Sequence, residues 1–240
     1  NEGNYATWSS IDKDSNVTVS SGNTVAEQDS TGSFKNVLAT QVVPNTGKWV
    51  WEIKQTLSSF VGDGYATTGV ASTNVARSIG RSGSGAITFD YRSSATTIRK
   101  FQSSPTESNY ATGVSLTNTD FTIQFAIDSD AEELKLFVSN SQVGTTLDIS
   151  SLTKPYKIIS QLYSGGNVDH TLVTNSDDFV NNVPSGYKTI NTANLPAPTV
   201  KDGSKYFAAV TYTGDTNNNR NITGFQDAAG NNVTPDWVWI

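Results

Sequence analysis

Side chains with oxygen atoms occupy every second position of the segment DKDSNVT, residues 12–18, as the ligands of a Ca²⁺-binding loop do. The full EF-hand pattern also requires a glycine at the sixth position and an acidic residue at the twelfth. Those two positions hold Val17 and Asn23. We therefore expect a polar turn that leads into a strand. The alternating residues are Asp12, Asp14, Asn16 and Thr18.

The single histidine, His170, lies next to Asp169 in the segment NVDHTLV. Neighbouring residues of a strand point to opposite faces, so these two side chains diverge. A Ser-His-Asp triad needs three convergent side chains, and the chain has no GxSxG segment. We expect His170 to be a strand residue with no catalytic role.

Glycoside cleavage would require two carboxylates about 5–10 Å apart across a cleft. The available carboxylates occupy turns and strand ends, where acidic residues are common, and no pair stands out. We therefore do not expect an enzyme, and a polysaccharide depolymerase is the least favoured function. The candidates are Asp63, Asp90, Glu107, Asp128 and Asp130.

The composition excludes several other functions. The 240 residues carry a net charge of -6 without a basic cluster, so nucleic acid is not an expected partner. No apolar run reaches the roughly 18 residues that a membrane span needs. The absence of Cys excludes disulfides and thiolate metal sites, and no cofactor is implied.

Because the chain has no Met and ends on PDWVWI, we expect it to be a fragment of a longer polypeptide.

Short strands separated by polar turns predict an all-β chain. Ser, Thr and Asn make up about a third of the residues, and no long helical apolar pattern occurs. Regular short strands of this kind are typical of an antiparallel β-sandwich. We expect hairpins through residues 129–132 and 164–166. The predicted strands are residues 16–20, 36–43, 48–57, 65–72, 82–92, 96–102, 120–128, 133–139, 156–163 and 167–175.

The strongest strand, GKWVWEIK at residues 47–54, places Trp49, Trp51 and Ile53 on one face. Such a tryptophan pair is either a stacking platform for a sugar or part of a hydrophobic core. We favour the core, because burying an aromatic side chain stabilises a fold by about 1.5–3 kcal/mol. A sugar platform would require exposed rings instead.

The pattern changes near the C-terminal end of the chain. We expect residues 1–190 to form the sandwich and residues 191–203, which contain two prolines, to be a linker. Residues 204–240 would begin a second, truncated β module, with strands at 205–214 and 236–240. Two or three strands cannot bury a core on their own.

GKWVWEIK, followed by GDGYATTGVAS at residues 62–72, resembles the signature of SPRY (B30.2-like) domains, which are concanavalin-like, jelly-roll-type sandwiches. FTIQFAIDSDAEELKLFVSN resembles the hairpin of that family, and KPYKIISQLYSGGNVD its closing segment. The resemblance covers roughly residues 5–187. The chain departs from the family at Asn140-Ser141, where Asn-Gly is usual, and in the loop at residues 74–85. These departures do not change the expected fold, but the resemblance does not identify a specific ligand.

A second resemblance involves both ends of the chain. NYATWSSIDKDSNVTVSSGN, PSGYKTINTANLPAPTVKDGSKYFAAVTYTGD and PDWVWI are similar to segments of modular tail-associated proteins of marine bacteriophages. This resemblance implies a virion protein of the tail or a fibre, located in the phage particle. Its partners would be other virion proteins or a host-surface receptor, glycan or protein. By analogy with fibres it would form a homo-oligomer, with a trimer as the first expectation.

In the SPRY resemblance, a rigid sandwich presents variable loops to partners. Three loops are expected to converge at one edge and bind the receptor or partner. Tyr and Arg are residue types that often anchor interfaces, although the same tyrosines could merely cap the sandwich. The function implied is non-enzymatic host attachment or docking within the virion, with a carbohydrate-binding lectin as the alternative. The loop residues are Gly64, Tyr65, Arg81, Ser82, Tyr163, Ser164 and Gly165.

Overall fold

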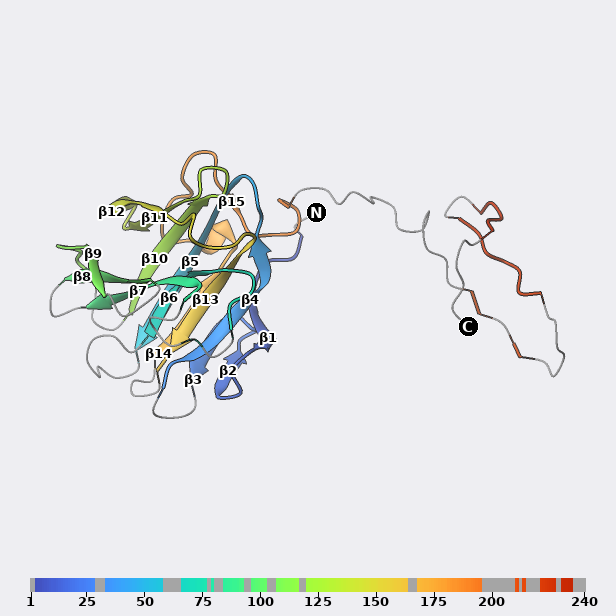
Figure 1. Cartoon of the computed structure of the whole chain (residues 1–240), viewed down its shortest axis with the longest axis horizontal. Helices are drawn as coiled ribbons and strands as arrows, with labels where there is room; N and C mark the ends of the chain where they lie inside the picture. The colour runs from blue at the N-terminus through green and yellow to red at the C-terminus, as the bar shows by residue number, and fades with distance from the viewer. Residues whose placement is uncertain are drawn as a thin grey trace. The chain divides into compact units, whose positions relative to one another are not determined.

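The computed structural model of the chain divides into two compact units, residues 1–195 and residues 196–240. The first unit is a two-layered β-sandwich (Figure 1). The structure describes residues 3–28, 33–57, 66–76, 79, 84–92, 96–102, 107–116, 120–163, 168–195, 210–211, 213–214, 221–227 and 230–234.

The first sheet has seven strands, in the order β1-β4-β13-β6-β7-β8-β9, and all its pairs are antiparallel. Its edges are β1 and β9. The strands are β1 (Trp8–Lys13), β4 (Lys35–Val43), β6 (Ala66–Ala71), β7 (Ala86–Arg92), β8 (Thr97–Gln102), β9 (Ser108–Ala111) and β13 (Tyr156–Leu162).

The second sheet has the order β12-β11-β10-β5-β14-β3-β2, with the short β15 as an eighth strand beside β5. Among the pairs formed by the described strands of this sheet, only β15–β5 is parallel. Its strands are β2 (Val17–Ser20), β3 (Val25–Gln28), β5 (Lys48–Leu57), β10 (Asp120–Asp128), β11 (Glu133–Val138), β12 (Ser141–Asp148), β14 (Val168–Val173) and β15 (Lys188–Thr189).

The prediction of an all-β antiparallel sandwich is confirmed. Each strand predicted between residues 16 and 175 overlaps an observed one, and the β10–β11 hairpin forms through residues 129–132 as expected. The sequence pattern did not indicate β1, β3, β9 or β12. Three of these lie at a sheet edge, where exposed polar side chains weaken the alternation on which the prediction depends.

The predicted pairing of residues 156–163 with residues 167–175 is wrong. β13 belongs to the first sheet, where it lies between β4 and β6, and β14 belongs to the second sheet, between β5 and β3. The chain therefore crosses from one layer to the other after β13 instead of forming a hairpin. His170 on β14 and Ser160 on β13 meet between the two layers.

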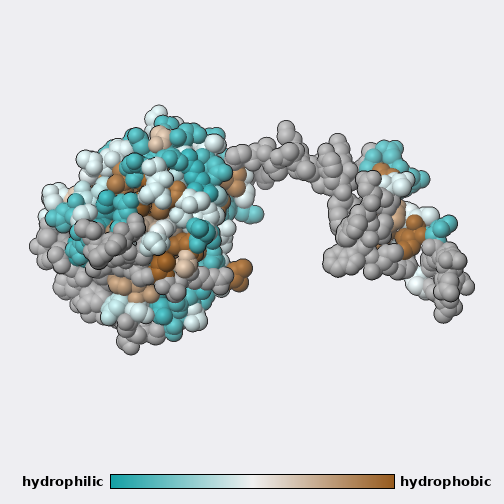
Figure 2. All heavy atoms as spheres, viewed as in Figure 1, coloured by the Kyte–Doolittle hydropathy of each residue, from teal (hydrophilic) through white to brown (hydrophobic). Residues whose placement is uncertain are grey.

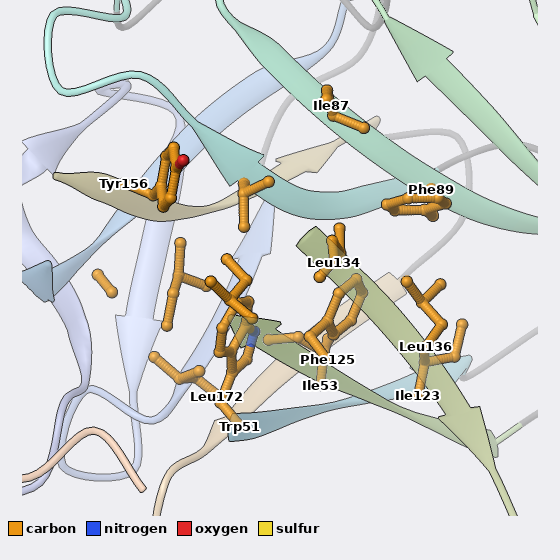
Figure 3. Packing of buried hydrophobic residues seen from close by; sticks show 14 of the residues in the cluster. Trp51, Ile53, Ile87, Phe89, Ile123, Phe125, Leu134, Leu136, Tyr156 and Leu172 are labelled. Atoms are coloured by element: carbon orange, nitrogen blue, oxygen red, sulfur yellow. The ribbon is translucent and has the colours of Figure 1, made fainter. Parts of the chain in front are cut away.

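The tryptophan-bearing strand β5 lines the core, as predicted. Trp51 is fully buried, and its ring stacks on Phe125 of β10 with centroids 5.5 Å apart and planes 5° apart. From the opposite sheet, Phe89 of β7 packs against Phe125 at 6.0 Å. Figure 3 shows these rings among aliphatic side chains from both layers. The pair is therefore not an exposed stacking platform.

The middle of the other face of β5 is also buried, at Val50 and Glu52, which the alternation did not indicate. Glu52 is fully buried there, beneath the segment that follows β14. Its carboxylate accepts hydrogen bonds from the backbone N–H groups of Val180 and Asn181, each at 2.8 Å, and from Asn181 Nδ2 at 2.9 Å. Gln124 Nε2 donates a further bond at 3.3 Å. The Glu52 side chain thus holds the segment that follows β14 against the second sheet.

The surface of the sandwich is largely polar with scattered apolar side chains. Figure 2 shows hydrophilic residues over much of one face, with small apolar patches between them. Among the described residues of the sandwich, the large hydrophobic side chains that are exposed are Ile11, Val180 and Val183. No helix in the described part of the chain is long and apolar enough to cross a membrane.

The start of the predicted linker, residues 191–195, packs on the sandwich. Asn191 forms a β-bridge with Tyr5, and Leu195 is partly buried against the core. In the second unit, Gln226 forms an antiparallel bridge with Asn232. The strands expected at 205–214 and 236–240 lie mostly or wholly outside the described residues. The predicted boundaries of the linker, after residue 190 and before residue 204, stay a prediction.

Candidate functional site: loop edge and sheet-edge cleft

Of the predicted loop-edge residues, the structure describes Tyr163 alone. It follows β13 directly, is half-buried, and its ring lies 5.3 Å from that of Phe34 at an angle of 46°. This contact is consistent with a tyrosine that caps the sandwich edge. The convergence of the three loops stays a prediction, because the other six residues lie outside the described residues: Gly64, Tyr65, Arg81, Ser82, Ser164 and Gly165.

The acidic segment at residues 12–18 contains the end of β1, a turn at residues 14–16 and the start of β2, so a polar turn precedes the strand as expected. Lys157 Nζ contacts Asp12 at 2.9 Å, and Lys35 Nζ contacts Asp14 at 3.5 Å. Asp14 also accepts a hydrogen bond from the backbone N–H of Asn16. The two carboxylates therefore form ion pairs with lysines. Within the described residues, no group of three or more His, Cys, Asp or Glu is placed to hold a metal ion.

His170 lies inside the sandwich rather than in a cleft. Its Nδ1 is 2.5 Å from Ser160 Oγ and its Nε2 is 3.0 Å from Gln55 Oε1. The third member is a glutamine amide, not a carboxylate, so the arrangement lacks the group that stabilises an imidazolium in a triad. Burial lowers the pKa of His170 to about 3, which keeps the ring neutral.

This buried histidine predicts a loss of stability in acid. The unfolded chain binds a proton at His170 below a pKa of 6.5, whereas the folded chain does so only near a pKa of about 3. Stability is therefore complete above pH 6.5 and falls as the pH drops toward 3. At pH 4.5 the expected loss from this group is about 3 kcal/mol. Urea unfolding at a series of pH values measures it.

A His170→Gln variant provides the control, because glutamine can hydrogen-bond both neighbours without titrating. Burial raises the pKa of the adjacent Asp169, which favours the folded state in acid and opposes part of the effect. The hydrogen bond from Lys48 lowers the pKa of Asp128, which adds to the acid loss. Both groups remain in the variant. Parallel pH profiles for the two proteins would contradict the prediction.

Two of the carboxylates considered for glycoside cleavage bind one arginine. Arg99 of β8 donates from Nε and Nη2 to the two oxygens of Asp90, at 2.8 and 2.5 Å. Its Nη1 donates to Glu107 at 2.6 Å. The side chains of Asp90 and Arg99 are only 1% and 3% exposed. This bidentate pair is a structural contact, because Asp90 cannot face a substrate from that position.

Asp128 and Asp130 hold the turns at one end of the second sheet. Lys48 Nζ lies 2.9 Å from Asp128, and this hydrogen bond holds the pKa of the carboxyl below its ordinary value. Asp130 accepts a hydrogen bond from the backbone N–H of Gly47 at 3.0 Å. Asp128 therefore joins the end of β10 to the start of β5, and Asp130 joins the turn after β10 to the turn before β5. Asp63, the remaining candidate, lies outside the described residues.

A cleft of about 620 Å³ opens where the edges of the two sheets meet. The edge strands β9 and β12 lie at the same end of the sandwich (Figure 1). The cleft is lined by residues 110–115, 138–139 and 142–144. Its volume lies in the range of roughly 300–1,000 Å³ that is usual for small-molecule sites. The sequence pattern missed this site, because it depends on two edge strands that come from different sheets.

Tyr110 joins the two edges at the base of the cleft. Its hydroxyl donates to the backbone carbonyl of Thr145 at 2.5 Å, and its ring packs edge-on against Phe89 at 5.1 Å. Burial raises the pKa of Tyr110 to about 12, so the phenol keeps the proton that it donates. Gly144 has φ +67°, and a Cβ there would lie 2.6 Å from the Tyr110 ring. The close approach of the two strands therefore requires glycine.

Tyr91 holds the loop that forms the other wall. Its hydroxyl donates to the carbonyl of Val114 at 3.1 Å, and the backbone N–H of Leu116 donates to it at 3.3 Å. Val114 N–H also bonds to the carbonyl of Thr96 at 2.9 Å. Opposite this loop, Ser139 and Asn140 have φ of 50° and 66° and form the two-residue turn between β11 and β12. One wall is thus held by hydrogen bonds to loop backbone groups, and the other is a tight hairpin turn.

No protein-family model and no curated protein matches this sequence. Solved structures that match include the SPRY domain of human HERC1, with a TM-score of 0.54 and 16% identity over 69% of this chain and 96% of that chain. The TRIM65 PSpry domain matches with a TM-score of 0.52 and 16% identity over 72% and 94%. Stonustoxin matches with a TM-score of 0.50 and 16% identity over 70% of this chain and 27% of its own.

These structural matches show the fold alone, because the identities are low. The sandwich has the fold of SPRY domains, which confirms that part of the resemblance read from GKWVWEIK and the hairpin at residues 121–140. The chain spans nearly the whole of the two SPRY domains but only about a quarter of stonustoxin.

Proposed function

We propose that this chain is a non-enzymatic binding module of a bacteriophage virion, carried on the tail or a fibre. Its stiff sandwich would present a binding surface to a component of the host-cell surface or to a neighbouring virion protein. The virion assignment rests on the sequence resemblance at the two ends of the chain. The homo-oligomeric state, with a trimer as first expectation, rests on analogy with fibres.

The observation that supports binding over catalysis is how the chemically active side chains are used. Each described candidate carboxylate and the one histidine is committed to a structural contact. The described cleft, in contrast, has no ionisable side chain other than the phenol of Tyr110. General acid–base catalysis requires titratable groups that face the substrate. A rigid scaffold with an uncharged cleft therefore favours recognition, and disfavours the depolymerase.

The experiment is a binding assay with the purified 240-residue chain. Intact marine bacterial cells and their purified surface polysaccharide serve as probes, and a Tyr65→Ala/Arg81→Ala/Tyr163→Ala variant tests the loop edge. A Lys54→Ala/Tyr187→Ala variant, altered outside the three predicted loops, is the control. Circular dichroism verifies that each protein is folded.

Loss of binding in the loop-edge variant alone would support receptor recognition by the three loops. Equal binding by all proteins would contradict the loop-edge assignment and keep the attachment role. Absence of binding to every cell and polysaccharide would contradict host attachment. The remaining form of the proposal, docking within the virion, would then be tested by capture of purified tail proteins on the immobilised chain.

A further inference from the structure

The cleft between β9 and β12 combines an uncharged lining with polar groups that are free to bind a ligand. None of its lining residues is Lys, Arg, Asp, Glu or His. A phosphate, a sulfate or a carboxylate would find no charged partner there. The lining therefore favours an electrically neutral ligand.

The rim of the cleft presents exposed hydroxyl and amide groups. Thr112 and Ser115 lie on the loop after β9, and Ser139 and Gln142 lie on the facing hairpin. Within the described part of the chain, these four side chains make no hydrogen bond to protein. Each can donate and accept, so together they can bind a molecule that carries several hydroxyl groups.

The floor of the cleft is apolar and small. Ala111, Val114 and Val138 are buried there, and Val143 is half-buried. A sugar ring has hydroxyl groups around its edge and C–H groups on its faces. An apolar floor below a polar, neutral rim is complementary to that distribution, since ligand sites pair a mostly apolar surface with a few placed polar groups.

An added peptide strand, the other neutral ligand that a sheet edge could take, fits less well. The register of β12 against β11 shifts between Leu134 and Leu136, which marks a bulge in the edge. The carbonyl of Thr145, at this irregular part of the strand, already accepts the Tyr110 hydroxyl. Strand addition requires a regular row of free backbone groups, which this edge does not offer.

We infer that the cleft between β9 and β12 binds a short neutral saccharide through Thr112, Ser115, Ser139 and Gln142. The inference rests on the proposed function, because it takes the chain to be a binding module, but it assigns recognition to a surface other than the predicted loop edge.

The test is titration of the ¹⁵N-labelled 240-residue chain with glucose, galactose, mannose and N-acetylglucosamine, with glucuronic acid as the charged comparison. Saturable shifts of the backbone amides of Gly113 and Gly144 are expected for at least one neutral sugar. A Thr112→Val/Gln142→Leu variant should bind that sugar about tenfold more weakly or worse, because it removes hydrogen-bonding groups and keeps the side-chain size. Thr146→Val, on β12 outside the cleft, should bind as the parent does.

Shifts that are equal in the parent and the cleft variant, tighter binding of glucuronic acid, or no shift with any neutral sugar would overturn the inference. Assay of the same cleft variant against cells separates this result from the proposed function. Cell binding that depends on the loop edge and not on the cleft would leave the proposed function standing without this inference. Amide shifts in the cleft without any binding to cells would support the saccharide site and contradict host attachment.

Discussion

Replacing Trp51 with alanine is expected to lower the free energy of unfolding by about 3–5 kcal/mol. Trp51 is fully buried and stacks on Phe125, so truncation removes a large apolar surface and leaves a cavity that both sheets line. A loss of this size is a large part of the roughly 5–15 kcal/mol that stabilises a typical domain. Urea unfolding followed by circular dichroism measures the change.

A Trp51→Phe variant keeps the test informative if the alanine variant fails to fold. Phenylalanine retains a stacked ring, and the indole N–H that it removes has no hydrogen-bond partner in the described part of the chain. The loss should therefore be clearly smaller than for alanine. The exposed Lys54 on the same strand is the control, since Lys54→Ala should change stability by no more than about 0.5 kcal/mol. Near-wild-type stability of Trp51→Ala would contradict the core assignment.

Replacing Glu52 with glutamine is expected to destabilise the fold by about 3 kcal/mol. The buried carboxylate accepts from two backbone N–H groups and two side-chain amides. A glutamine amide can accept through one oxygen only, and its NH₂ group would face the N–H of Val180 or Asn181. At least one buried donor is then left without an acceptor. Thermal and urea unfolding of both proteins measure the difference.

Amide hydrogen exchange measures the effect of the Glu52 substitution at individual backbone amides, in addition to its effect on overall stability. Loss of the carboxylate should increase exchange at Val180 and Asn181 more than in the core strand β10. Glu27→Gln, on the half-buried β3 of the same sheet, is the matched control and should change stability by no more than about 0.5 kcal/mol. Unchanged protection of residues 180–181 in Glu52→Gln would show that the connection is held by other contacts.

Much of the sandwich could be predicted because its inner strands alternate strongly. Residues 48–57 and 120–128 were located to within a residue, since one face of each packs against the core. β9 and β12 were missed because their exposed edge positions carry polar residues with no clear period. The pairing of β13 with β14 was wrong because two apolar strands joined by a glycine-rich turn resemble a hairpin whether or not they share a sheet.

The candidate sites, like the strands, were predicted where local sequence determines them and missed where distant segments meet. The turn within residues 12–18 and the position of His170 in a strand followed from local spacing, whereas the contacts of His170 with Ser160 and Gln55 did not. The cleft could not be predicted, since Tyr110 and Gly144 approach each other only when the edges of two sheets are brought together. Nothing in the neighbourhood of either residue along the chain indicates that contact.

Local periodicity and composition were sufficient to establish an all-β sandwich without thiol chemistry and with Trp51 in its core. These properties depend on neighbours along the chain and on the burial of one strand face. The three-dimensional fold was needed to show the buried middle of the second face of β5, where Glu52 holds residues 180–181, and the neutral cleft between β9 and β12. Both arise from contacts between segments distant in sequence, which chain topology brings together and residue spacing does not encode.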